Sequence, residues 1–196
     1  MPVNRSVPDA AQKRKDWNGL ISGFKARDLV FLDESGCNTD MTRRYAYSLG
    51  GSRAIDSAPL SKPKNTTILS SIQLDGTLRY TTFSGGTTVE RFKRYLETDL
   101  LPHLNENSVL IMDNMKLHHA KAVKNLLDSS GVRYIYLPPY SPDLNPIEKL
   151  WSKVKAFLRK FKARTLDALP NAIQNAFHSV TISDCSGWFR FCGYAL

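Results

Sequence analysis

The stretches LVFLD at residues 29–33 and VLIMD at residues 109–113 decide the fold. In each, four consecutive apolar residues precede an aspartate, and a short apolar run of this kind is typical of a strand buried on both faces. A carboxylate at the end of a buried strand costs free energy unless it is paired or used. In α/β proteins, functional sites lie at the carboxyl ends of strands. Asp33 and Asp113 are therefore candidate site residues; the alternative for each is a turn-starting or helix-capping role.

Three more strands and a set of helices follow from the hydrophobic periodicity. Residues 66–74 and 78–83 form a predicted hairpin, because Asp75-Gly76 between them is a turn signal. Residues 132–137 form another predicted strand. The predicted helices cover approximately residues 87–104, 117–129, 149–164 and 165–180. A hairpin followed by βαβ crossovers predicts an α/β fold, in which helices flank a mixed five-stranded sheet.

The length of 196 residues fits one domain. Residues 1–28 are polar and mixed in charge, with one short helical stripe of apolar residues. We therefore expect residues 1–28 to form a lead-in helix or tail and residues 29–196 to form the domain. No apolar run approaches the roughly 18 residues of a membrane span, and residues 1–20 lack the apolar stretch of a secretory signal. A cytoplasmic protein without a membrane partner is the expectation.

Basic residues outnumber acidic ones by 27 to 18, which gives a net charge of +9 and predicts a polyanionic partner. Most of the excess lies in residues 149–164, which have no acidic residue. The apolar residues of this segment recur at helical spacing, so one face packs on a core and the other is cationic. An ordinary solvated helix face is the alternative, but such faces mix signs because like charges at i,i+4 repel. The basic residues are Lys149, Lys153, Lys155, Arg159, Lys160, Lys162 and Arg164.

Glu148 stands at the start of this basic helix. Asn145, Pro146 and Glu148 fit a helix N-terminus with a capping-box glutamate, which is the structural alternative for Glu148. Helical geometry nevertheless places Glu148 beside Lys155 and Arg159, on the cationic side. Together with the two strand-end aspartates it offers hard oxygen ligands suited to Mg²⁺ or Mn²⁺. Two such ions can promote phosphodiester cleavage, and no phosphate-binding loop indicates a nucleotide cofactor.

Four stretches resemble the catalytic domain of the mariner-type transposases, and in particular their bacterial insertion-sequence branch. The resemblance runs from about residue 28 to the end, and the proline-rich third stretch is the most specific. The spacing also fits that branch, because 34 residues lie between Asp113 and Glu148. The stretches are LVFLDESGCNTDMTRRY, VLIMDNMKLHHA, YLPPYSPDLNPIEKLWSKVKAFLR and WFRFCGYA.

The resemblance implies a ribonuclease-H-like fold and cut-and-paste transposition of double-stranded DNA, with transposon ends and target as substrates. It also implies an Asp-Asp-Glu triad of Asp33, Asp113 and Glu148, which would be both the catalytic and the metal-binding residues for two Mg²⁺ or Mn²⁺ ions. His118 matches a family histidine near the active site, with a structural role as the alternative. The candidate DNA-binding residues are Lys149, Lys153, Lys155, Arg159, Lys160, Lys162 and His118.

One departure concerns the N-terminal helix-turn-helix modules of the family, for which residues 1–28 are too short. An upstream-frame helix-turn-helix polypeptide is therefore a candidate partner, as is a second copy of the chain in a homodimer. The expected location is the bacterial nucleoid. Competing with the transposase hypothesis are a non-catalytic DNA-binding remnant and a host ribonuclease or Holliday-junction nuclease of the same fold. The complete carboxylate triad argues against the remnant, and the proline-rich stretch argues against the nuclease.

Overall fold

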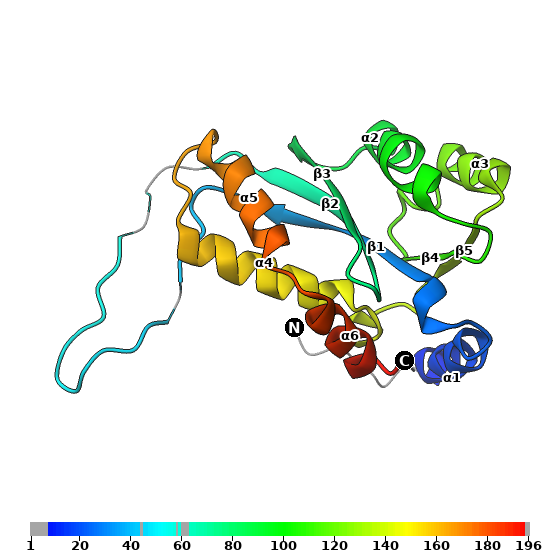
Figure 1. The fold of residues 1–196 in the computed structure, drawn as a ribbon, viewed down its shortest axis with the longest axis horizontal. Coiled ribbons are helices and arrows are strands. Elements are labelled where there is room, and N and C mark those ends of the chain that lie inside the picture. The colour runs from blue at the N-terminus through cyan, green and yellow to red at the C-terminus, as the bar shows by residue number, and fades with distance from the viewer. Residues whose placement is uncertain (1–7, 44, 58, 60–62, 195–196) are drawn as a thin grey trace.

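The computed structural model describes residues 8–43, 45–57, 59 and 63–194, and a five-stranded sheet forms its centre (Figure 1). The strand order is β3-β2-β1-β4-β5, with antiparallel pairing on the β2 side of β1 and parallel pairing on the β4 side. The predicted α/β fold with a mixed sheet is therefore confirmed. The strands are β1 (Leu29–Cys37), β2 (Thr66–Gln73), β3 (Leu78–Ser84), β4 (Val109–Met112) and β5 (Arg133–Tyr136).

Helices cover both faces of the sheet, with α2 and α3 on one side and α4, α5 and α6 on the other (Figure 1). Short 3-10 or π-helical turns connect several of these elements. The helices are α1 (Pro8–Ile21), α2 (Val89–Tyr95), α3 (Lys121–Ser130), α4 (Ile147–Phe161), α5 (Ala168–His178) and α6 (Ile182–Phe191). The turns are η1 (Ala26–Asp28), η2 (Leu96–Leu100), η3 (Leu101–His103) and η4 (Pro142–Leu144).

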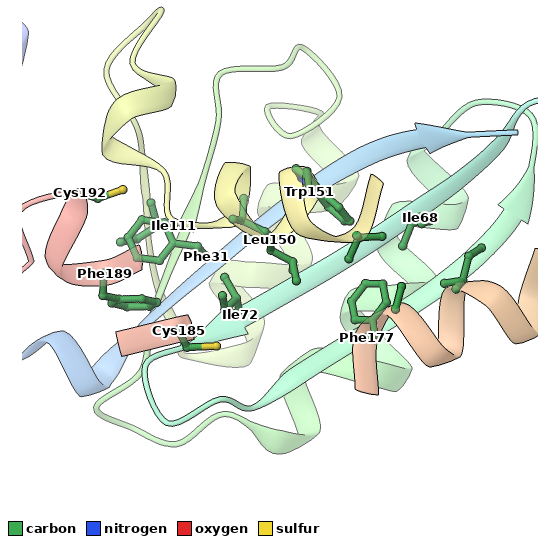
Figure 2. Close-up of a cluster of buried hydrophobic side chains, with 14 of the residues drawn as sticks. Phe31, Ile68, Ile72, Ile111, Leu150, Trp151, Phe177, Cys185, Phe189 and Cys192 are labelled. Carbon is green, nitrogen blue, oxygen red and sulfur yellow. The ribbon is translucent and has the colours of Figure 1, made fainter. Parts of the chain in front are cut away.

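Alternation along the central strands divides the core into two layers. Phe31 and Ile111 point toward the layer of α4, α5 and α6, whereas Leu32 and Met112 point toward α2 and α3. Figure 2 shows the first layer, where Phe31 and Ile111 pack near Phe189 of α6 while Leu150 and Trp151 descend from α4. Because both faces of the sheet are covered here, residues 29–32 of β1 and all of β4 form unbroken apolar runs.

The first helix is joined to this core. Trp17 of α1 is only 3% exposed and belongs to the same buried cluster as Phe31 and Ile111. Arg14, on the same helix, forms an ion pair with Asp143 in the segment before α4. Helix α1, which lies within the segment predicted as a lead-in helix, thus packs directly against the core.

Several predicted boundaries were wrong. The helix predicted at 87–104 is α-helical only to Tyr95, and then continues through the π-helical turn η2 and the 3-10 turn η3. The helix predicted at 165–180 is α5, and the following helix α6 was missed, although Thr181 and Asp184 form a capping box at its start. Among the residues that the structure describes, no helix is both long enough and apolar enough to cross a membrane.

We predict that Trp17→Ala lowers the free energy of unfolding by about 3–5 kcal/mol, because it removes a buried aromatic ring from the core. Urea unfolding followed by circular dichroism measures this change. Leu20→Ala, on the same helix but 48% exposed, is the matched control and should change stability by less than about 1 kcal/mol. Equal effects of the two substitutions would mean that α1 is not part of the folding unit.

Candidate active site

The parallel pairing of β1 with β4 brings the two aspartates together. Leu32 lies opposite Met112 in the last pair of the register, so the next positions along the two strands are Asp33 and Asp113. Paired residues of neighbouring strands point to the same face. For these two residues that face is the one covered by α4. One expected detail was wrong, since Asp33 does not end β1: the strand continues to Cys37 by pairing with β2.

Asp33 is the most enclosed of the three candidate carboxylates, with 9% exposure. The indole Nε1 of Trp151 donates a hydrogen bond to Asp33 Oδ2 at 2.9 Å. Burial raises the pKa of Asp33 to about 7; the Trp151 hydrogen bond opposes this shift, and the nearby charge of Glu148 adds to it. From the sequence, Trp151 is one of the apolar residues of segment 149–164 that are predicted to pack on the core. Trp151 lies three residues after Glu148, about one helical turn, and this spacing could have predicted a role at the site.

Asp113 is held by hydrogen bonds at the end of β4. The backbone N–H of Met115 donates to its Oδ1 at 2.9 Å, and Nδ1 of His118 lies 2.8 Å from the same oxygen. Burial alone would raise the pKa of Asp113, but the hydrogen bonds from His118 and Met115 outweigh it and hold the pKa below its usual value. Asp113 therefore favours the ionised form.

Glu148 lies in the first turn of α4, where the helix dipole favours a negative charge. Partial burial raises its pKa, the positive charge of Lys155 opposes this shift, and the charge of Asp113 adds to it. The capping-box alternative was wrong. Helix α4 has no side-chain cap, and the Oδ1 atom of Asn145 is buried without a hydrogen-bond partner. The carboxylate of Glu148 is thus available to the site.

The three carboxylates line one cavity of about 430 Å³. Its remaining walls come from the segment after β4 and from the proline-rich segment between β5 and α4. Most of these wall residues are apolar or uncharged. They are Asn114, Met115, Leu137, Pro138, Pro139, Tyr140, Ser141, Pro142 and Asn145.

The donor chemistry of this cavity fits a hard divalent cation, because it combines three carboxylates with the unpaired amide oxygen of Asn145. The charge interactions of Glu148 with Asp33 and Asp113 raise pKa values, and a bound cation would relieve that repulsion. The ligands are not assembled in advance: in the described part of the chain, no three His, Cys, Asp or Glu side chains cluster closely enough to hold a metal ion.

His118 links Asp113 to a fourth acidic residue that the sequence analysis missed. Its Nε2 lies 3.2 Å from Glu34 Oε1, and its ring stacks on Phe92 of α2 at a centroid distance of 4.6 Å. Burial alone would lower the pKa of His118, but the hydrogen bonds to Asp113 and Glu34 raise it to about 10. The imidazole is fully buried, so the predicted contact of His118 with DNA was wrong. Glu34 could have been found from the sequence, because side chains alternate between the two faces of a strand, and this alternation turns Glu34 toward α2.

Some basic residues of the predicted cationic face of α4 contact side chains of the protein, and others form no ion pair among the described residues. Lys149 Nζ lies 3.8 Å from the centroid of the Phe191 ring. Lys153 forms an ion pair with Asp184 of α6 at 2.5 Å, and Lys162 forms one with Asp56. These three contacts join α4 to α6 and to the long loop between β1 and β2.

Lys155, Arg159 and Lys160 form no ion pair among the described residues. The charge of Lys155 acts on both Glu148 and Cys37, so it lies between the cavity and the end of β1. Lys155 and Arg159 also line a second cavity beside the end of β1, and Arg159 and Lys160 line a third on the outer side of α4. The basic side chains without an ion pair therefore form a row that runs from the carboxylate cavity along α4.

We predict that His118→Ala lowers the free energy of unfolding by about 3–5 kcal/mol, because it leaves the buried Glu34 carboxylate without its partner. Urea unfolding measures the change, and exposed His103→Ala is the control. Combining His118→Ala with Glu34→Gln should recover part of the loss, since the uncompensated charge is gone. If the stability losses of the two single substitutions simply added in the double variant, the pairing of His118 with Glu34 would be contradicted.

Comparison with known proteins agrees with this architecture. Residues 28–170 match the family described as DDE superfamily endonuclease. The Tc1 transposase of Caenorhabditis elegans is 30% identical over 97 residues, which are 47% of this chain and 36% of the relative. The Tcb2 transposase of Caenorhabditis briggsae is 31% identical over 75 residues, or 38% of this chain and 28% of the relative. The chain thus spans about a third of the length of these curated relatives.

Solved structures of the Mos1 mariner transposase share the fold. Its catalytic domain has a TM-score of 0.71 at 16% identity, over 92% of this chain and 86% of that one. A Mos1 paired-end complex with Mn has a TM-score of 0.81 at 19% identity, over 97% of this chain and 61% of that one. The neighbours support a ribonuclease-H-like fold. Since the family match covers most of the sequence, the chain belongs to the DDE superfamily endonucleases, with homologues among the Tc1/mariner-type transposases.

Proposed function

We propose that the chain is the catalytic domain of a transposase that cleaves and joins DNA strands with divalent metal ions. Asp33, Asp113 and Glu148 are its catalytic and metal-binding residues. The observation that carries the proposal is their meeting at one cavity, although they come from two strands and one helix. Mos1 paired-end complexes have been solved with Mg and with Mn, which supports the same choice of metal here.

The residues around the triad orient its carboxylates. Trp151 holds one oxygen of Asp33, and His118 holds one oxygen of Asp113. Two bound Mg²⁺ or Mn²⁺ ions would activate a water or 3′-hydroxyl and stabilise the leaving oxygen of the phosphodiester. In Asp113 both hydrogen bonds fall on Oδ1, which leaves Oδ2 for a ligand.

Double-stranded DNA is the substrate that fits the charge around the cavity. Lys155 and Arg159 follow Glu148 at positions i+7 and i+11 of α4, so a phosphate backbone leaving the triad meets a row of cations. Contacts of this kind recognise charge and not sequence. The proposal therefore assigns a general DNA grip to Lys155, Arg159 and Lys160.

The bacterial insertion-sequence branch is our proposed position within the family, on the grounds of the 34 residues between Asp113 and Glu148 and the proline-rich segment. Its location would then be the bacterial nucleoid. We further propose that a helix-turn-helix segment outside these residues, such as an upstream-frame polypeptide, recognises the transposon ends. Plasmid excision with and without that polypeptide would decide the point.

We predict that Asp113→Asn lowers Mg²⁺-dependent nicking of duplex DNA by more than about 100-fold. Removing residues that merely support metal ligands costs about 10- to 100-fold, so losing a ligand charge should cost more. Plasmid nicking followed on agarose gels measures the rate. Asn keeps the shape of the side chain, so the melting curve should stay close to that of the unsubstituted chain.

Glu106→Gln is the matched control, because it also removes one carboxylate charge, but from an exposed residue that lies before β4, at the opposite end from Asp113. Its nicking rate should be unchanged. Unaltered cleavage by Asp113→Asn would contradict the triad. Salt-sensitive DNA binding without any metal-dependent nicking by the unsubstituted chain would instead favour the non-catalytic remnant.

We predict that replacing Lys155 and Arg159 together with Ala makes DNA binding less dependent on salt. Each neutralised phosphate contributes about 0.9 to the slope of log affinity against log salt, so the slope should flatten by roughly one to two. Fluorescence anisotropy titrations of a labelled duplex between low and moderate salt measure it.

Lys153→Ala with Lys162→Ala is the control, since it removes the same net charge from cations already paired with Asp184 and Asp56. It should change the slope by less than half as much. If the two pairs of substitutions had equal effects, net charge and not the position of the cations would govern binding.

A further inference from the structure

Tyr140 has a backbone conformation that tyrosine rarely adopts. Its φ is 55°, in the left-handed region, where a residue with a Cβ is strained. Its side chain is 83% exposed, whereas the following residue, Ser141, is buried. A strained backbone that presents a large ring to solvent suggests a role outside folding.

The segment around Tyr140 is held from several sides. Arg14 donates a hydrogen bond to Ser141 Oγ at 3.1 Å and forms an ion pair with Asp143 at 2.5 Å. Asn114 donates to the carbonyl of Leu137, and Tyr194 donates to the carbonyl of Leu144. Four prolines within residues 138–146 restrict the backbone further. The surrounding structure therefore fixes the exposed position of the ring.

The ring itself has no partner in the described part of the chain: no hydrogen bond, ion pair or ring contact involves the Tyr140 side chain. It lines the carboxylate cavity. Met115, which is 43% exposed, and Pro142 extend the same apolar rim. The cavity is thus lined both by carboxylates and by an aromatic ring with apolar neighbours.

The same proline-rich segment holds a second unsatisfied group. Asn145 is 4% exposed, and its Oδ1 atom is buried in the cavity wall without a hydrogen-bond partner. Buried polar atoms nearly always have a partner, so this oxygen indicates a missing ligand or ordered water. Because an amide oxygen only accepts hydrogen bonds, the missing partner is a donor, such as an ordered water or a base N–H, or else a cation. A nucleotide combines a base with N–H donors and a flat face on which the Tyr140 ring can stack.

We propose that Tyr140 stacks on a nucleobase adjacent to the phosphodiester at the carboxylates, and so positions the strand for cleavage. The inference rests on the proposed function of the cavity. Every base has a face on which an aromatic ring can stack. Inside a duplex, neighbouring bases cover both faces, so the base must be at a strand end or flipped out of the helix. The substrate of this subsite is therefore an unpaired nucleotide.

The test uses Asp113→Asn as an inactive background and a duplex with a single unpaired 2-aminopurine at one 3′ end. This base is fluorescent when free and quenched when it stacks. The chain with Tyr140 should quench it, and Tyr140→Phe should do the same because the ring remains. Tyr140→Ala and Tyr140→Gly should leave the base bright and weaken binding of this DNA about 5- to 150-fold, which corresponds to the stacking of one base.

Tyr140→Gly separates the ring from the strain, because glycine adopts a positive φ freely. It should melt no lower than the chain with Tyr140, so a loss of quenching cannot be attributed to unfolding. Tyr47→Ala, which removes an exposed tyrosine outside the cavity, should quench normally.

The outcomes are distinguishable. Quenching that persists in Tyr140→Ala and Tyr140→Gly overturns the inference and leaves the triad intact, provided that the chain with Asp113 still nicks DNA. A chain that neither binds nor nicks DNA overturns the proposed function and the inference together. A change in sedimentation instead of quenching would assign Tyr140 to a contact between copies, which also overturns the inference.

Discussion

The parallel register of β1 with β4 is the constraint on which the site depends. It places Asp33 and Asp113 at neighbouring positions, one residue past the last paired residues, Leu32 and Met112. Shifting the register by one residue would turn the apolar side chains of a strand to the opposite layer of the core. The packing that fixes the fold therefore also fixes the spacing of the two aspartates. The only further requirement is that Glu148 lies on the same face of the sheet.

The segment between β5 and α4 places Glu148 on that face. Its prolines limit the backbone, and Arg14 of α1 holds it through Ser141 and Asp143. Within α4, Trp151 fixes the position of the helix on the sheet, because its ring packs in the core and its Nε1 donates a hydrogen bond to Asp33. Helix α4 cannot slide or rotate without losing this hydrogen bond, so the position of Glu148 is coupled to that of Asp33.

Local signals allowed much of this to be predicted from the sequence. The apolar runs before Asp33 and Asp113 defined two central strands, and Asp75-Gly76 marked the hairpin, where Gly76 indeed has a φ of 89°. The failures involve distant partners. The polar half of β1, residues 33–37, is a strand only because β2 pairs with it. No periodicity reveals that His118 will pair with Glu34, 84 residues earlier.

The same reasoning explains why the cationic face of α4 was predicted too broadly. A helical wheel records which residues share a side, but not what packs beside them. Helix α6, which the sequence analysis missed, supplies Phe191 and Asp184 as partners for Lys149 and Lys153. Cations that a neighbouring helix engages stabilise the fold, and those left beside Glu148 remain available to a phosphate backbone. The missed helix thus determines which part of a uniformly basic segment can bind DNA.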